Sequence, residues 1–123
     1  MHRLMLVAML LATGPAWAEW VKVGETEQSS YYVDPVTIRK DADTRQFWTL
    51  QDMKAPDKGG DLSYRVLVEA DCKERRSRTL RADYFRRPMA EGERTGGTGK
   101  LDDWRYARSG TVGDAVMKFV CSR

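Results

Sequence analysis

The sequence contains very few of the residues on which most enzyme chemistry depends. Its 123 residues include one histidine, His2, and two cysteines, Cys72 and Cys121. A Ser-His-Asp or Cys-His arrangement requires a histidine beside the nucleophile, and a zinc site requires several converging His, Cys, Asp or Glu ligands. We therefore expect a protein that is not an enzyme, with no catalytic residues, no metal site and no cofactor.

Some polar residues leave other interpretations open. Asp102-Asp103, or the pair Glu91 and Glu93, could supply the two carboxylates of a minor hydrolase. A serine–lysine dyad would not be recognisable in the sequence. Asp41-Ala42-Asp43 lacks the glycine and the distal glutamate of an EF-hand loop, so we interpret it as a hairpin turn.

The sequence also lacks a hydrophobic run of the length that spans a membrane, about 20 residues. Its longest run, Leu4–Ala12, has nine residues, follows a short basic head and precedes the small-residue pattern Ala16-Trp17-Ala18. This layout predicts a signal peptide over residues 1–18, cleaved before Glu19. An N-terminal anchor or a buried helix is the alternative. We expect the mature chain, 19–123, to form a single domain outside the cytoplasm.

Both cysteines fall in that mature chain, and an even number of cysteines in an exported protein predicts a disulfide. A Cys72–Cys121 bridge would stabilise the fold by about 4 kcal/mol, because it reduces the conformational entropy of the unfolded chain. Two free thiols or a metal-binding pair are the alternatives.

Alternation of apolar and polar residues predicts an antiparallel sheet. The pattern is clearest in Leu62–Cys72 and in Ser77–Phe85, which we expect to form a hairpin with Thr79, Arg81 and Asp83 facing outward. Shorter strands are predicted at Trp20–Val23, Ser30–Val33, Val36–Arg39 and Gln46–Met53, and loops at Ala55–Asp61 and Met89–Lys100.

Only the C-terminus has a helical period. Val112, Ala115, Val116, Phe119 and Val120 form one apolar stripe, and Thr111 with Asp114 can cap the start of the helix. Cys121 projects away from this stripe, so we expect the helix to unwind at its end to allow the bridge. The predicted fold is α+β: an antiparallel sheet of about five or six strands with one C-terminal helix packed on one face.

Several local motifs occur in an order typical of one family. They are Trp20, Tyr31-Tyr32-Val33-Asp34-Pro35, Trp48, Asp71-Cys72 followed by basic residues, Trp104, and Ser109–Gly113 leading to Cys121. Together they resemble the surface-adhesin protein E family of small bacterial envelope proteins, over nearly all of residues 19–123. The resemblance implies a sheet backed by a helix and adhesive binding to host extracellular-matrix proteins.

Adhesins of this kind are commonly displayed through a lipid-modified N-terminal cysteine. Because no cysteine precedes Cys72, we expect no lipoprotein anchor. The protein is then expected in the periplasm or secreted, with the cell surface as a further location, and it is not expected to span the membrane.

The stretch Lys73–Arg87 is the strongest charge feature. It holds seven basic and two acidic residues, a local excess of five, whereas residues 19–123 have 20 Lys and Arg against 18 Asp and Glu, an excess of two. Arginine pairs well with carboxylate, sulfate and phosphate groups. The sequence thus predicts a ligand-binding patch composed of Lys73, Arg75, Arg76, Arg78 and Arg81. The alternative is a solvated edge whose arginines pair with carboxylates such as Glu69 and Asp71.

The expected partners are a host matrix protein, a sulfated glycan or an envelope component, with a homodimer as a further option. Nucleic acid is not expected outside the cytoplasm. A different function would be a periplasmic accessory or inhibitor protein that presents Met89–Lys100 to an enzyme. The aromatic residues are expected mainly in the core of so small a domain; they are Trp20, Tyr31, Tyr32, Trp48 and Trp104.

Overall fold

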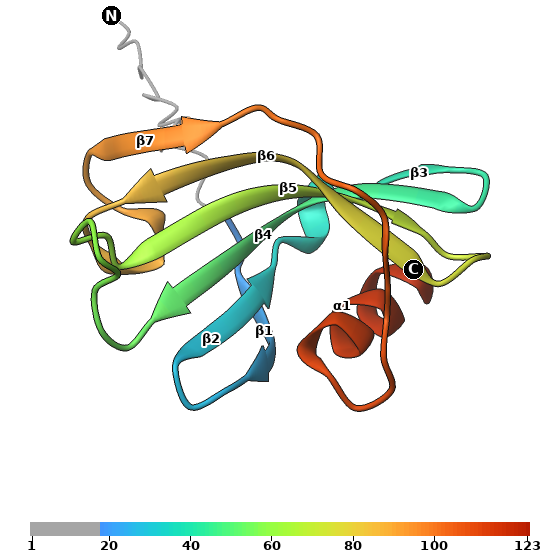
Figure 1. The fold of residues 1–123 in the computed structure, drawn as a ribbon. Helices are drawn as coiled ribbons and strands as arrows, with labels where there is room; N and C mark the ends of the chain where they lie inside the picture. Colours follow the sequence, from blue (N-terminus) through green and yellow to red (C-terminus); the bar gives the residue numbers. More distant parts are fainter. Residues whose placement is uncertain (1–17) are drawn as a thin grey trace, which may run out of the picture.

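The alternating segments of the sequence form a twisted antiparallel sheet, and the C-terminal helix lies across one of its faces (Figure 1). The structure, a computed structural model, describes residues 18–123. The predicted fold class is confirmed. Except for Ala18, the predicted signal peptide lies outside the described residues. Within residues 18–123 no helix is both long and apolar enough to cross a bilayer.

Six principal strands lie side by side in the order β1-β2-β4-β5-β6-β7. Two short strands add to this sheet, β3 beside β4 and β8 beside β6. The strands are β1 (Val21–Glu25), β2 (Ser29–Val33), β3 (Arg39–Asp41), β4 (Thr44–Met53), β5 (Ser63–Asp71), β6 (Arg76–Phe85), β7 (Arg94–Thr98) and β8 (Arg105–Tyr106). The predicted hairpin is therefore β5–β6, and residues 41–43 form the tip of the β3–β4 hairpin.

The predicted strand at Val36–Arg39 is wrong. Pro35–Thr37 form a short 3₁₀ helix, η1, and only Arg39 belongs to a strand. Proline fixes a backbone angle suited to the first helical position, and the Asp34 carboxylate accepts a hydrogen bond from the Val36 amide at 3.1 Å. The Asp-Pro pair therefore starts a helical turn before the strand.

The prediction of Met89–Lys100 as one long loop is also wrong, because β7 lies within it. A second 3₁₀ turn, η2 (Pro88–Ala90), precedes this strand. β7 runs very close to β6: a Cβ placed on Gly97 would lie 2.5 Å from the carbonyl oxygen of Ala82. Glycine, which suggested a loop, is here required for close strand pairing.

A bulge in β6 changes which side chains face outward. Leu67 pairs with Arg81, but the next pair is Val68 with Thr79, so Leu80 has no partner in β5. Arg81 faces away from the helix as predicted. Thr79 was predicted to face outward and instead shares the helix side with Val68, because the extra residue reverses the alternation before it.

The core lies between the sheet and α1 (Val112–Cys121). It is built on Val33, Phe47, Ala70, Met117 and Val120, all at most 2% exposed. The Thr111 hydroxyl accepts a hydrogen bond from the Asp114 amide, which confirms Thr111 as the cap. The reciprocal bond of a capping box is not formed, because the Asp114 carboxylate accepts from the Gly110 amide and the Thr111 amide donates to the Arg108 carbonyl oxygen.

The predicted disulfide is confirmed as Cys72–Cys121. Cys121 is the last helical residue and packs against the core, so the expectation that the helix unwinds at its end to allow the bridge is wrong. The bridge joins the C-terminal end of α1 to the residue that follows β5.

Candidate ligand-binding face

The side of the sheet opposite α1 carries most of the charged residues of the strands. Residues directly opposite each other on antiparallel strands point to the same side, so the strand registers identify this surface. We call it the arginine face. Its central residues are Arg39, Gln46, Trp48, Arg65, Leu67, Glu69, Asp71, Arg76, Arg78, Arg81 and Asp83, together with Arg94, which bonds Asp83 from β7.

Positive charge on this side of the sheet is concentrated around Asp83. Along β3 to β7 the registers place five carboxylates on this side, those of Asp41, Asp52, Glu69, Asp71 and Asp83, against six arginines, so the side as a whole has an excess of one positive charge. At Asp83 three arginines share one carboxylate. Such a local concentration of one sign of charge attracts ligands of the opposite sign.

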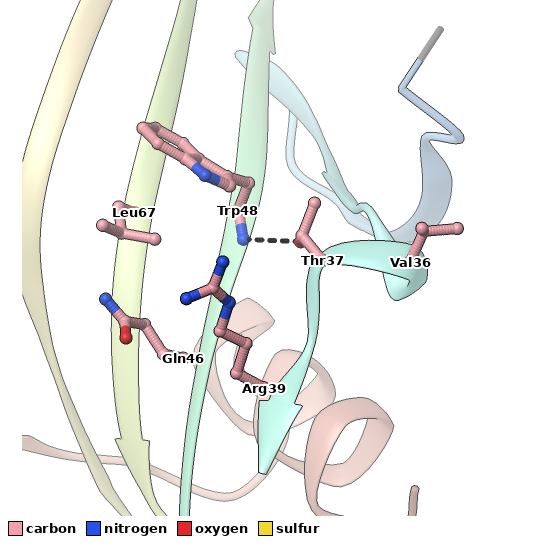
Figure 2. Close-up of a pocket in the computed structure, with 6 residues that line it drawn as sticks. All are labelled: Val36, Thr37, Arg39, Gln46, Trp48 and Leu67. Atoms are coloured by element: carbon pink, nitrogen blue, oxygen red, sulfur yellow. Dashed lines mark hydrogen bonds between the residues drawn. The ribbon is translucent and has the colours of Figure 1, made fainter. Parts of the chain in front are cut away.

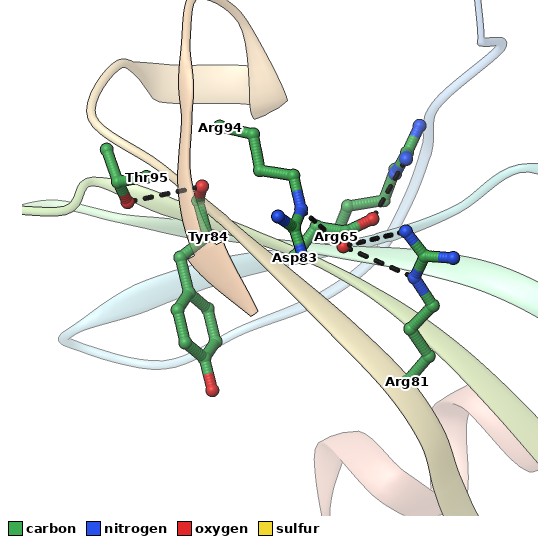
Figure 3. Close-up of polar contacts among 6 residues, drawn as sticks. All are labelled: Arg65, Arg81, Asp83, Tyr84, Arg94 and Thr95. Atoms are coloured by element: carbon green, nitrogen blue, oxygen red, sulfur yellow. Dashed lines mark hydrogen bonds and ion pairs between the residues drawn. The ribbon is translucent and has the colours of Figure 1, made fainter. Parts of the chain in front are cut away.

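Asp83 lies at the centre of the largest cluster. Its side chain is 0% exposed, and its carboxylate accepts from Arg65 at 2.9 Å, Arg94 at 2.9 Å and Arg81 at 3.2 Å (Figure 3). Burial alone would raise the pKa of Asp83, but the three arginine hydrogen bonds outweigh it and hold the pKa below its usual value. The carboxylate is therefore ionised at neutral pH and neutralises only one of three guanidinium groups.

The prediction that Asp83 faces outward is correct, but the residue is not accessible to solvent. The residue points to the side away from α1, yet the three arginines cover it completely. These arginines keep 41–52% of their own side-chain surface exposed. The cluster presents guanidinium groups, and no carboxylate, to the solvent.

Trp48 and Trp104 sit among the arginines. The guanidinium of Arg65 lies 4.6 Å from the Trp48 ring centre, and those of Arg76 and Arg78 lie 4.5 and 4.3 Å from the Trp104 ring centre. Such cation–π contacts orient the guanidinium groups while leaving their charge in place. Trp48 and Trp104 are half-buried residues of this face.

A groove crosses the arginine face beside η1. One hollow of about 440 Å³ is lined by Val36, Thr37, Arg39, Gln46, Trp48 and Leu67 (Figure 2). A second, of about 410 Å³, is lined by Ala18, Glu19, Trp20, Asp34, Val36, Thr37, Trp48 and Arg65. Both volumes lie in the range of small-molecule sites.

The structure brings together three of the five predicted ligand-binding residues. Arg76, Arg78 and Arg81 are on the arginine face, where each also pairs with a carboxylate of the chain. Arg75 points the other way and bonds Asp114 of α1, and Lys73 is exposed in the β5–β6 turn. The predicted pairing with Glu69 and Asp71 is seen for Arg78 and Arg76.

Sequence reasoning missed Arg39, Arg65 and Arg94 as members of this face. Arg65 was recognisable as an outward residue of the alternating strand Leu62–Cys72, but its neighbours on other strands were not. Arg94 lay in a predicted loop. Among residues 18–123 no three His, Cys, Asp or Glu residues group closely enough to hold a metal ion.

The fold and this face define a class: a small disulfide-linked α+β protein with a helix on one sheet face and a cationic, aromatic surface on the other. The family model described as Surface-adhesin protein E matches residues 20–122. The chain belongs to this family, as its motifs predicted, and is an adhesin-like protein of the exported or surface kind.

Solved structures agree on the fold. Crystal form II of Haemophilus influenzae protein E is 14% identical with a TM-score of 0.68, covering 88% of this chain and 91% of the other. The selenomethionine form of the same protein is 15% identical with a TM-score of 0.67, covering 88% and 89%. No curated protein sequence matches this chain.

Proposed function

We propose that this protein is a non-enzymatic binding module that attaches to anionic components of a host surface through its arginine face. The observation that supports it best is the Asp83 cluster, in which three half-exposed arginines share one buried carboxylate. A sulfated glycan or an acidic protein surface would neutralise the two remaining charges. Arg76, Arg78 and Arg81 are the proposed contacts, and exposed Lys73 lies at the end of the β5–β6 hairpin. Arg75 is not among them, because it bonds Asp114 on the helix side.

We also propose that the mature protein acts outside the cytoplasm, in the periplasm, in the medium or at the cell surface. The Cys72–Cys121 disulfide supports this location, because such bonds persist in oxidising compartments. Family membership supports adhesion over the alternative of a periplasmic accessory or inhibitor protein. The segment once expected to serve as an inhibitory loop is partly strand β7.

Retention on immobilised heparin, a sulfated polyanion, tests the proposed face. The double variant Arg78→Gln and Arg81→Gln is expected to bind more weakly and elute at lower salt. In the counterion-release relation, the slope of log affinity against log salt should fall by roughly one unit for each lost contact.

The matched control is Lys40→Gln with Lys58→Gln. It removes the same two charges, from a residue on the helix side of β3 and from the loop after β4. Equal retention of both double variants and the unmodified protein would show that the arginine face is not the heparin-binding surface.

A further inference from the structure

The groove beside η1 is preformed. Its two hollows share Val36, Thr37 and Trp48 in their walls and therefore adjoin each other at the indole of Trp48. The Trp48 amide donates to Thr37 Oγ1 at 3.0 Å (Figure 2), which attaches the groove wall to β4. A ligand entering a groove that is already held in shape loses little free energy to ordering it.

One end of this groove offers uncommitted polar groups. Arg39 and Gln46 are cross-strand neighbours whose side chains are directed toward the same hollow (Figure 2). Within residues 18–123 neither side chain forms a hydrogen bond or ion pair with the protein, whereas Arg65, Arg76, Arg78, Arg81 and Arg94 are all paired. Arg39 is thus the arginine of this face whose charge is least compensated.

The charges along the groove determine at which end a negatively charged ligand group would bind. The far hollow includes Glu19 and Asp34 beside Arg65, so a negatively charged ligand group is favoured at the Arg39 end. Between the ends lie the indole of Trp48 and the side chain of Leu67, and Val36 on the wall is 76% exposed. The groove therefore combines one cationic end, one amide and an apolar, aromatic centre.

We propose that this groove binds one sugar residue of an acidic polysaccharide, with its ring against Trp48 and its carboxylate or sulfate on Arg39. A sugar ring has an apolar face of C–H groups that packs against an indole, and its hydroxyls suit the Gln46 amide, which both donates and accepts. The arginine fork suits a carboxylate or a sulfate. This inference rests on the proposed function and specifies its ligand class and a subsite.

A heparin-derived tetrasaccharide is the probe, and its affinity is measured by titration calorimetry. Arg39→Gln is expected to weaken binding on the order of tenfold, since hydrogen bonds to charged groups have about this effect. Lys40→Gln is the matched control: it removes the same charge from the adjacent residue, which pairs with Arg45 on the helix side of the sheet. It should leave the affinity within about twofold.

Two further variants test the aromatic centre. Trp48→Leu keeps an apolar side chain but removes the stacking surface, and binding should weaken by roughly tenfold. Far-UV circular dichroism verifies that this variant folds. Gln46→Glu places a negative charge beside Arg39 without changing the side-chain size much, and it should weaken binding whether or not Trp48→Leu is stable.

Equal affinities of the Arg39→Gln and Lys40→Gln variants, or no binding of the tetrasaccharide, would overturn the proposal that the groove is a sugar-binding site. Retention of the unmodified protein on heparin, lost in the Arg78/Arg81 variant, would then still support the proposed function. A poly-glutamate peptide that binds as tightly as the tetrasaccharide, with the same dependence on Arg39, would overturn the saccharide as ligand class.

Discussion

Asp83 shows how a single residue can organise a cationic surface. A buried carboxylate is costly unless it is paired and hydrogen-bonded, and here three arginines from three strands supply the pairing. The arginines repel one another, and Asp83 reduces this repulsion without being accessible to solvent. The residue thus stabilises the sheet and the arginine face together.

We expect Asp83→Asn to lower the free energy of unfolding by about 2 kcal/mol at pH 7, because charged hydrogen bonds are lost. The pKa of Asp83 is depressed in the folded protein, so its contribution is present above the unfolded value of about 4 and is lost as pH falls further. The variant should therefore lose less stability than the unmodified protein between neutral and strongly acidic pH.

Urea unfolding at neutral and acidic pH measures both effects. Asp102→Asn is the control, since Asp102 is exposed and forms no ion pair among the described residues. An Asp83→Asn variant as stable as this control at pH 7 would contradict the account.

At the level of elements, the helix and the long strands followed from the sequence because their patterns were long and regular. Val112–Val120 carried a full apolar stripe, and Leu62–Cys72 alternated over its whole length except at Leu67. Three local features were not predictable in the same way. They are the 3₁₀ turn after Asp34, the bulge at Leu80 and the glycine-containing strand β7. The turn has a local cause, the Asp34-Pro35 cap, whereas the bulge and β7 depend on cross-strand contacts.

The candidate site was predictable only in part for the same reason. Arg76, Arg78 and Arg81 are close in sequence, so their common segment drew attention. Arg39, Arg65 and Arg94 join them only through the pairing of β3, β5 and β7 with their neighbours. A one-residue bulge decides whether an arginine before it faces the ligand side or the core.

At the scale of a single element, a prediction concerns the N-terminal cap of α1. Thr111→Ala should lower the free energy of unfolding by about 1 kcal/mol, because the Asp114 amide loses its acceptor. Ser109→Ala, two residues earlier and exposed, should have little effect. Thermal and urea unfolding measure the difference, and equal stabilities of the two variants would argue against the cap.

For the whole molecule, the disulfide is the principal covalent constraint. It joins residues 49 positions apart and attaches α1 to the end of β5. The core that it supports is small, with five buried residues between sheet and helix. The stability of this domain is therefore expected to depend strongly on the oxidised state.

The double variant Cys72→Ala and Cys121→Ala should lose about 4 kcal/mol of unfolding free energy by the chain-entropy relation. Denaturant unfolding of this variant, of the oxidised protein and of the protein in a reducing agent measures the loss. The reduced protein should resemble the variant. Identical unfolding curves with and without reductant would contradict a stabilising role of the bridge.

The two ends of the part of the chain that the structure describes lie on different sides of the molecule. Glu19 lines the groove next to Trp48, whereas Arg123 stacks on Phe119 of α1 and bonds Arg45 on the helix side. An affinity tag or a bulky label joined ahead of Glu19 would stand at the mouth of the groove and obstruct it. Attachment through the C-terminus leaves that surface open, and it is the orientation in which the protein should be immobilised for any search for its ligand.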